Sequence, residues 1–396
     1  MLYPTVVYPA FLFIAVLAYW FLPAAARRYW LTLASFVLLS YLSWRGTLAL
    51  LVLALFVFHA GQRIRAAGPG AVRTRWMTAA IVVPLAYLCT FKYLPSYSPP
   101  IRMLLEQMST TGLLIPLGIS YFTFKFVHYV IECRRNTLPA HDVWDFLCYS
   151  SLFSIFSAGP IERFGNLQPQ LASSRFDAAS ISYGLQRILF GMLKKVLVVD
   201  FLLVEALDRI SVEASAPQGH AWYALFAFLW CRFLFGYLDF SAYSDLAIGT
   251  SRLFGLRVIE NFDWPVLRRN LSEFWRSWHM SLSSWCRDYV YFPVFGATRN
   301  PKIAVYASMI VLGYWHGPDL GWILWGAWHA TGLAVWQNWQ TFKRRHHSVF
   351  GTGRGNLLTD AAGTLLTINY VVIGGVWIAA DNVVDAARFL YYIVVP

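Results

Sequence analysis

The stretch TVVYPAFLFIAVLAYWFLPAAA, Thr5 to Ala26, contains no charged residue. A helix rises about 1.5 Å per residue and the hydrocarbon core of a bilayer is about 30 Å thick, so this run is long enough to cross it. Two arginines, Arg27 and Arg28, follow at once, and a second apolar run extends from Tyr29 to Trp44. The beginning of the chain therefore predicts a hairpin of two membrane-spanning helices.

A cleaved signal peptide is the alternative for the first run, because the small residues of PAAARR resemble a cleavage site. That interpretation is disfavoured, since Met1 to Ala10 contains no Lys or Arg to form the positive leader of such a peptide.

The composition extends this prediction to the whole chain. Of the 396 residues, 58% are hydrophobic and 13% are charged, which is unlike a water-soluble globular protein. We predict an all-α integral membrane protein with about 11 transmembrane helices and additional re-entrant and amphipathic helices. No hydrophilic stretch is long enough for a separate soluble domain, so residues 1–396 are expected to form a single multi-pass membrane domain. The predicted spans are 6–24, 29–44, 47–61, 76–94, 112–131, 181–205, 221–238, 302–316, 320–339, 358–379 and 383–395.

The positive charges favour a membrane topology over a nucleic-acid partner. The net charge is +12, but the cations fall in short loops between apolar runs. Alternate loops are the basic ones, with Arg27 and Arg28 in the first, four arginines between 63 and 75 in the third, and Arg134 and Arg135 after the fifth span. The positive-inside rule places these loops in the cytoplasm and the N-terminus outside. The later cluster KRRHH, Lys343 to His347, is expected to be cytoplasmic too and to contact anionic lipid.

The cysteines do not indicate a metal site or a disulfide framework. All five stand singly, without a CxxC pair. Cys286 is a possible nucleophile, but a buried small hydrophobic residue is the favoured interpretation. Regions 144–160 and 240–295 are apolar but interrupted by Gly, Pro, Ser, Asp and Arg. Irregular backbone survives at membrane depth only where protein or a water-filled cavity satisfies it, so these regions are candidate re-entrant segments.

The most polar of these stretches is EFWRSWHMSLSSWCRDYVYFPVFG, Glu273 to Gly296. Placed on one helix from 273 to 290, it separates an aromatic side from a polar side. The aromatic side holds Trp275, Trp278, Leu282, Trp285 and Tyr289, and the polar side holds Arg276, His279, Ser283 and Arg287. This pattern is typical of a helix that lines a polar tunnel, and an interfacial anchor with a tryptophan belt is the alternative.

A second polar group lies in GYWHGPDLGWILWGAWHATG, Gly313 to Gly332. His316 precedes Gly317 and Pro318, so it is expected at a helix break, with Pro318 opening the next helix. His329 lies about 140° away around an unbroken helix, so the two histidines need not share a face. Ionisable residues at membrane depth are costly and are functional candidates, although a neutral histidine bonded to a carbonyl is the simpler alternative.

A histidine in this setting points to proton transfer. Its pKa near neutrality allows it to take a proton from an alcohol while the oxygen attacks an acyl carbon. No GxSxG elbow supports a serine acyl-enzyme, and no HExxH motif supports zinc. Direct acyl transfer with a histidine base is the simplest hypothesis.

These residues also resemble a known family. The segment from Leu238 to Val294, followed by YWHGPDLGWILWGAWHA, is similar to the signature of membrane-bound O-acyltransferases, the MBOAT superfamily. Upstream, PLGISYFTFKFVHYVIE and FSAGPIERFGNLQPQL resemble its bacterial branch, so the likeness covers about residues 116–330. Ser277 departs from the pattern, because relatives often carry Arg there.

The resemblance implies a bowl of tilted helices with a central tunnel in the bacterial cytoplasmic (inner) membrane. It implies no bound cofactor and no metal, but an acyl donor, acetyl-CoA or an acyl carrier protein thioester, on the cytoplasmic side. The acceptor would be a hydroxyl of an extracytoplasmic glycan or of a partner protein. His316 matches the family's WHG histidine and would be the catalytic base, with His279 in the same chamber. Further expected contributions are donor or chamber contacts from Arg276, Ser283, Trp285 and Arg287, and support from Asp245, Asn261 and His329.

Two bacterial branches remain open. One O-acetylates surface polysaccharides, and the other passes D-alanine from a carrier protein toward teichoic acid. The matched motifs favour the first branch, whereas FPVFGATRN and the short end of the chain after Ala330 are closer to the second. Two interpretations from other classes are a proton-relaying transporter, disfavoured because no internal repeat is visible, and a structural scaffold for glycan export.

Overall fold

The computed structural model describes residues 7–108, 116–214, 221–346 and 357–394. Within these ranges every regular element is a helix, as predicted. The starts of the predicted spans 6–24 and 112–131, the end of 383–395, and His347 lie outside the described residues. The chain divides into two compact units, one formed by 1–191 with 243–259 and the other by 192–242 with 260–396. The two units are described separately below.

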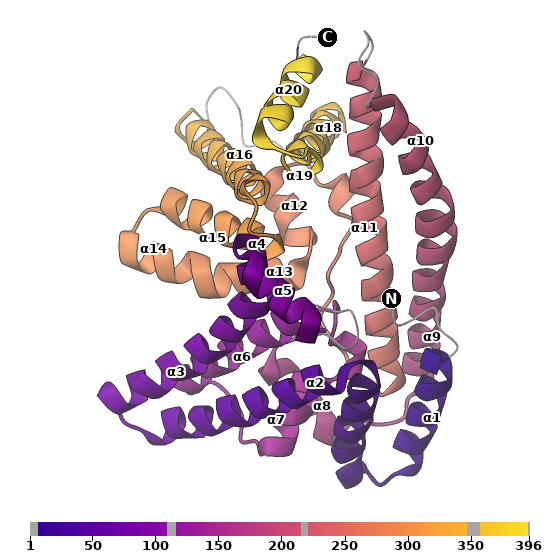
Figure 1. Ribbon diagram of the computed structural model, residues 1–396, viewed down its shortest axis with the longest axis vertical. Helices are drawn as coiled ribbons and strands as arrows, with labels where there is room; N and C mark the ends of the chain where they lie inside the picture. Colours follow the sequence, from indigo (N-terminus) through magenta and orange to yellow (C-terminus); the bar gives the residue numbers. More distant parts are fainter. Residues whose placement is uncertain (1–6, 109–115, 215–220, 347–356, 395–396) are drawn as a thin grey trace. The chain divides into compact units, whose positions relative to one another are not determined.

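Unit 1 contains the helices of the N-terminal half and the end of α11 (Figure 1). Its helices are α1 (Val7–Phe21), α2 (Ala24–Ala66), α3 (Ala71–Leu88), η1 (Cys89–Tyr93), α4 (Leu94–Tyr97), α5 (Pro99–Met108), α6 (Ile119–Arg135), α7 (Val143–Ser151), η2 (Phe153–Ile155), α8 (Phe164–Ser173), most of α9 (Ala178–Leu193) and the last residues of α11 (Ala221–Leu253). Helices α2, α3 and α6 pack against one another.

Helix α2 consists of two helical arms. Ser43 has a non-helical backbone (φ −161°, ψ 91°) that separates them. Arg28, near the start of α2, lies 2.9 Å from Asp142, and Arg65, near its end, lies 3.3 Å from His141. Along a straight helix these arginines would be about 55 Å apart, so the chain reverses at Ser43. The two arms correspond to the predicted spans 29–44 and 47–61.

The basic loops of unit 1 meet at one end of this helical hairpin. Arg28 also pairs with Asp145 at 2.9 Å, and Arg73 donates a hydrogen bond to the backbone carbonyl of Arg134. The three segments that the sequence places on one side of the membrane therefore lie together in unit 1.

Unit 2 contains the remaining helices. They are the end of α9, η3 (Lys194–Leu203), α10 (Val204–Ala214), most of α11, η4 (Pro265–Leu267), α12 (Leu271–Ser277), α13 (Met280–Cys286), η5 (Arg287–Tyr291), α14 (Phe292–Thr298), α15 (Pro301–His316), α16 (Leu320–Arg345), α18 (Leu357–Gly374), α19 (Val376–Ala379) and α20 (Val383–Val394). Helices α15 and α16 correspond closely to the predicted spans 302–316 and 320–339.

Small residues allow α15 and α16 to approach closely. A Cβ atom added at Gly313 would lie 2.2 Å from the backbone oxygen of Trp322, and one at Gly326 would lie 2.5 Å from that of Met309. Only glycine fits at such contacts between backbones. This close crossing places His316, the last residue of α15, beside the first turns of α16.

The two adjacent lysines of η3 have polar partners within unit 2. Lys195 in η3 lies 2.8 Å from Asp239 in α11 and 2.6 Å from Asp200. The neighbouring Lys194 donates a hydrogen bond to the Ser241 hydroxyl at 2.8 Å. Such pairing is what lowers the cost of charges at membrane depth.

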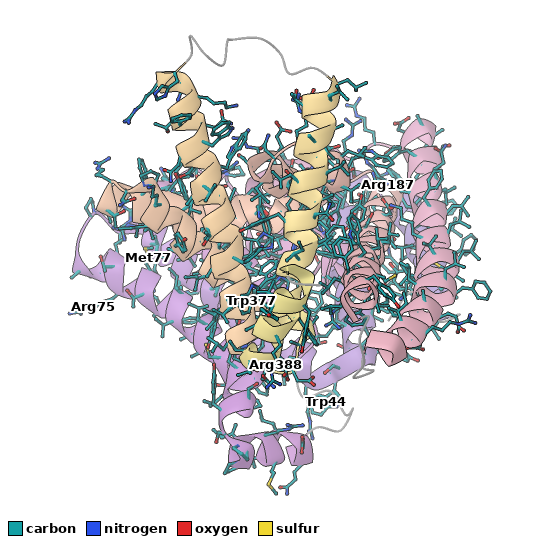
Figure 2. The ribbon with its side chains drawn as sticks, turned by 90° about the horizontal axis from the view of Figure 1, so that it is seen from above. Trp44, Arg75, Met77, Arg187, Trp377 and Arg388 are labelled. Carbon is teal, nitrogen blue, oxygen red and sulfur yellow. The ribbon has the colours of Figure 1, made fainter. Side chains whose placement is uncertain are left out.

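Among the described residues, four helical stretches are long and apolar enough to span a membrane, namely Ala24–Ala66, Ala71–Tyr97, Tyr223–Leu253 and Leu357–Ala379. Trp44 and Trp377, both labelled in Figure 2, belong to the first and the last of these stretches. In α18, for example, Leu358 and Leu366 are 79% and 76% exposed, which suits a lipid-facing surface. The structure thus supports a helical membrane protein, while the predicted count of about 11 spans is not confirmed.

Candidate functional site

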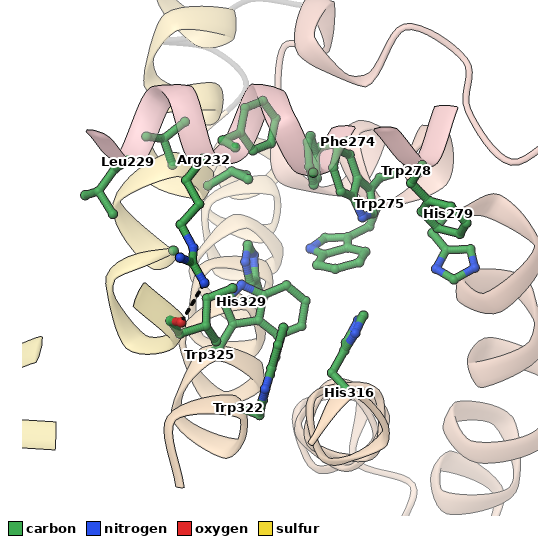
Figure 3. Close-up of a pocket in the computed structure, with 17 residues that line it drawn as sticks. Leu229, Arg232, Phe274, Trp275, Trp278, His279, His316, Trp322, Trp325 and His329 are labelled. Atoms are coloured by element: carbon green, nitrogen blue, oxygen red, sulfur yellow. Dashed lines mark hydrogen bonds between the residues drawn. The ribbon is translucent and has the colours of Figure 1, made fainter. Parts of the chain in front are cut away.

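A cavity of about 250 Å³ lies within unit 2. Helices α11, α12, α15, α16, α18 and α19 contribute its walls, together with the turn that follows α12. Most of the lining is aromatic or aliphatic, and three imidazoles and one guanidinium are set into it (Figure 3). The lining residues used below are Arg232, Phe240, Trp275, Trp278, His279, His316, Trp322, Trp325 and His329.

His316 stands at the end of α15 and its ring projects into the cavity (Figure 3). The imidazole stacks on Trp322 with ring centroids 4.5 Å apart and an interplanar angle of 14°. Trp325 meets it edge-on at 5.8 Å. His316 is exposed, unlike the two other histidines of the cavity. The helix break predicted at Gly317 and Pro318 is present, and α16 begins at Leu320.

His279 lies between α12 and α13 in a left-handed conformation (φ 41°, ψ 54°). This departs from the single helix predicted for 273–290. The reason is tertiary hydrogen bonding, because Asp263 N–H donates to the Ser277 carbonyl at 3.0 Å and Met280 N–H donates to the Asn261 carbonyl at 2.8 Å. The Ser281 hydroxyl also donates to the Asn261 side chain at 2.6 Å. Left-handed non-glycine residues are uncommon and cluster at functional sites.

The buried Asn261 side chain therefore fixes the turn that carries His279. The His279 ring packs edge-on against Phe240, with centroids 4.6 Å apart. Asn261 thus has a structural role at this turn, and its supporting role in the reaction stays a prediction.

His329 is fully buried between Trp275 and Trp325, with ring centroids 5.1 and 4.6 Å away. Several buried nitrogens of the cavity have no hydrogen-bond partner among the described residues: both ring nitrogens of His329, Nε2 of His279 and Nε1 of Trp275. Buried polar atoms are normally bonded, so these nitrogens are suited to binding polar atoms of a ligand.

The structure brings together the three predicted histidines, although periodicity alone left His316 and His329 on different faces. The other predicted contacts lie elsewhere. Arg287 pairs with Asp288 at 2.9 Å, Ser283 Oγ donates to the Trp278 carbonyl at 2.9 Å, and Trp285 packs on Tyr289. Neither these residues nor Arg276 are among the lining residues of the cavity.

Asp245 belongs to unit 1, where it pairs with Arg187 at 2.6 Å. Both side chains are largely buried. The contact joins α9 to the C-terminal part of α11, so it accounts for Asp245 by a structural role within that unit.

Sequence reasoning missed Arg232 and the indoles of Trp322 and Trp325. A signal for Arg232 was present, because it is the only charged residue in the predicted span 221–238, and such residues are functional candidates. No comparable signal marked the two tryptophans, because the sequence alone does not show which face of α16 lines the cavity.

The chain matches the profile of the membrane-bound O-acyltransferase (MBOAT) family over residues 11–359. It is 34% identical over 378 residues to the probable alginate O-acetylase AlgI of Pseudomonas aeruginosa, covering 91% of this chain and 68% of that protein. It is 25% identical over 421 residues to the peptidoglycan O-acetyltransferase of Helicobacter pylori, covering 96% and 77%. It is 29% identical over 309 residues to the teichoic acid D-alanyltransferase of Streptococcus thermophilus, covering 71% and 73%. The chain belongs to the membrane-bound O-acyltransferase family and is an O-acyltransferase.

Proposed function

We propose that this protein is a multi-pass enzyme of the bacterial cytoplasmic membrane that moves an acetyl group from a cytoplasmic thioester to an extracytoplasmic hydroxyl. The donor is acetyl-CoA or an acetylated carrier protein. The acceptor hydroxyl belongs to a surface polysaccharide or to a partner protein that passes the group on. The named O-acetylases among the relatives support the acetyl group and the glycan.

His316 is the general base of this proposal. A neutral ring nitrogen takes the proton of the acceptor hydroxyl as the oxygen attacks the thioester carbonyl carbon. The new C–O bond forms, the C–S bond breaks, and the departing sulfur leaves as a thiol with the proton that His316 returns. An ester and a thiol replace the alcohol and the thioester, so no oxidant or metal is required.

The observation that carries the proposal is the position of His316. It is the exposed histidine of a cavity whose other two histidines are 3% and 0% exposed, and Trp322 holds its ring by stacking. A base must reach a substrate proton, and a fixed ring orientation favours that transfer.

The test compares His316→Gln with His346→Gln. His346 is an exposed histidine at the end of α16 that does not line the cavity. Both proteins are assayed in membranes with labelled acetyl-CoA and, separately, with a labelled acetyl carrier protein. Loss of a general base lowers the rate by about 10²–10⁴-fold, so we expect that loss for His316→Gln and normal activity for His346→Gln. Full activity of a stably inserted His316→Gln protein would rule out the base assignment.

D-alanyl transfer toward teichoic acid is the second candidate. The support for it is the similarity to D-alanyltransferases from two species, at 29% and 28% identity. A D-alanyl carrier protein offered in the same assay decides between the two acyl groups.

A further inference from the structure

Arg232 is the one formally charged residue among the described residues that line the histidine cavity. Its side chain reaches from α11 toward the side of the cavity where Trp325 and His329 lie (Figure 3). One terminal nitrogen donates to the Ile378 carbonyl at 3.3 Å. A guanidinium has five N–H donors, so this single bond leaves others that can bind a ligand.

A purely structural role explains Arg232 incompletely. The contact with Ile378 satisfies a carbonyl in the last turn of α19, a common use of arginine. A neutral donor could do the same without placing a positive charge beside an aromatic cavity. A charged residue in a spanning helix is a functional candidate, and the exposed Arg232 side chain is able to reach a ligand.

The position of Arg232 in its helix indicates which substrate it faces. It lies 11 residues after the start of α11 and 21 before its end. Counted from an outside N-terminus, the predicted span 221–238 is the seventh and runs inward. In the topology that the positive-inside rule predicts, Arg232 is in the outer half of α11 (Ala221–Leu253), on the acceptor side in the proposed function, whereas the donor arrives from the cytoplasm.

The charge and shape of the cavity indicate the kind of acceptor. One guanidinium matches the charge of one carboxylate and binds it with two parallel hydrogen bonds. The indoles of Trp275, Trp322 and Trp325 line the cavity, and one face of Trp322 is covered by His316. Such an amphipathic aromatic lining suits the C–H side of a sugar ring. At about 250 Å³ the cavity is smaller than the roughly 300–1,000 Å³ of pockets for drug-sized ligands, so it suits one sugar residue of a polymer.

We propose that Arg232 determines acceptor specificity by binding the carboxylate of an acidic sugar whose hydroxyl faces His316. This inference rests on the proposed function and names its acceptor class. Arg232 contributes to binding and does not take part in the proton transfer.

The experiment measures kcat/KM for labelled acetyl transfer to two matched acceptors. One is an oligouronate and the other is the same oligomer with its carboxyl groups methyl-esterified, which keeps the hydroxyls and removes the charge. We expect the normal protein to prefer the acid at least tenfold. Arg232→Gln should lower kcat/KM for the acid by about 10–100-fold, the range for a lost hydrogen bond to a charged group, and change the value for the ester less than about twofold.

Two further variants complete the design. Arg209→Gln removes an exposed arginine of α10 that lies outside the cavity and should leave the preference for the acid unchanged. Arg232→Lys keeps the charge but loses the planar fork, so it should retain part of the preference. If Arg232→Gln fails to insert, the inference is tested by the ratio of kcat/KM for the acid to kcat/KM for the ester. This ratio is compared between the normal protein and Arg232→Lys.

Two results would overturn the inference. They are equal use of acid and ester by the normal protein, and an equal loss for both acceptors in Arg232→Gln. If transfer depends on His316 but ignores the carboxylate, only this inference fails. If no acceptor is labelled and His316→Gln changes nothing, the proposed function fails as well.

Discussion

At the scale of single residues, Asn261 is the support of the His279 turn. Its side chain is fully buried and accepts the Ser281 hydroxyl at 2.6 Å, and its backbone carbonyl accepts Met280 N–H at 2.8 Å. Asn261→Ala keeps the backbone bond but leaves the buried Ser281 hydroxyl without this partner. A buried unsatisfied group costs about 1–3 kcal/mol, so we expect the free energy of unfolding to fall by that amount and acyl transfer to fall with it.

A double-mutant cycle separates this contact from other effects of the change. Ser281→Ala removes the second partner, and in Asn261→Ala/Ser281→Ala no hydroxyl is left unsatisfied. The two losses should therefore be non-additive, with a coupling of about 0.5–3 kcal/mol measured by thermal unfolding in detergent. Strictly additive losses would mean that the hydrogen bond does not hold the turn.

The sequence singled out Asn261 and His279 but did not predict the turn between α12 and α13. Aromatic and polar side chains in residues 273–290 separate onto two sides at 100° per residue, and this pattern predicts one continuous helix. The break at Trp278 and His279 comes from hydrogen bonds to Asn261 and Asp263, which precede it by more than a helical turn and approach it only in the folded chain. Periodicity also placed Arg276, Ser283 and Arg287 beside His279, because it assumes a continuous helix. In the structure these three residues are not among those that line the cavity.

At the scale of helices, the contact between α15 and α16 controls where His316 lies. A methyl group at position 326 would lie 2.5 Å from the Met309 oxygen and 3.0 Å from its carbonyl carbon. These are backbone atoms, so a helix must move to make room. We expect Gly326→Ala to lower the free energy of unfolding by about 1–3 kcal/mol, the usual cost of overpacking, and to reduce activity because α15 carries His316.

Gly296→Ala is the matched control for this change. Gly296 lies in α14, and a Cβ atom there meets no atom of the described residues within 4 Å. Alanine is a better helix former than glycine by about 1 kcal/mol, so this variant should be as stable as the normal protein or slightly more stable. Equal behaviour of the two variants in thermal unfolding would contradict a tight crossing at Gly326.

Helix positions followed from the sequence where long apolar runs end at clear boundaries. Asn300 and Pro301 begin α15, and Gly317 ends it, as the predicted span 302–316 implies. The predicted span 221–238 was too short, because α11 continues to Leu253 through Asp239, Ser241, Ser244 and Asp245. In the sequence these polar residues indicated an interruption of the spanning helix. Lys195 pairs with Asp239 and Arg187 pairs with Asp245, so the free-energy cost of the two charged residues within the helix is small.

At the scale of the whole chain, topology links the charge pattern to the direction of transfer. The arginines of the first, third and post-fifth-span loops lie together in unit 1, as shown by the contacts of Arg28, Arg65 and Arg73. Arg45 lies beside the reversal at Ser43, at the other end of the α2 hairpin. The positive-inside rule makes the clustered end cytoplasmic, and the donor side of the proposed reaction depends on that assignment.

Cysteine labelling tests the cytoplasmic assignment of the clustered arginines directly. Arg75 and Arg45 are both exposed, and each is replaced by Cys in a protein whose five native cysteines are Ser. A membrane-impermeant maleimide added to spheroplasts should label Arg45→Cys at once and Arg75→Cys only after permeabilisation, because the reagent reaches only the outer face of a sealed membrane. The cysteine-free parent gives the background, and acyl transfer by each variant confirms that it is inserted correctly. Labelling of Arg75→Cys in sealed spheroplasts would show that the orientation is opposite to the predicted one. Arg232 would then lie on the donor side, and binding of an acceptor carboxylate could not be its role.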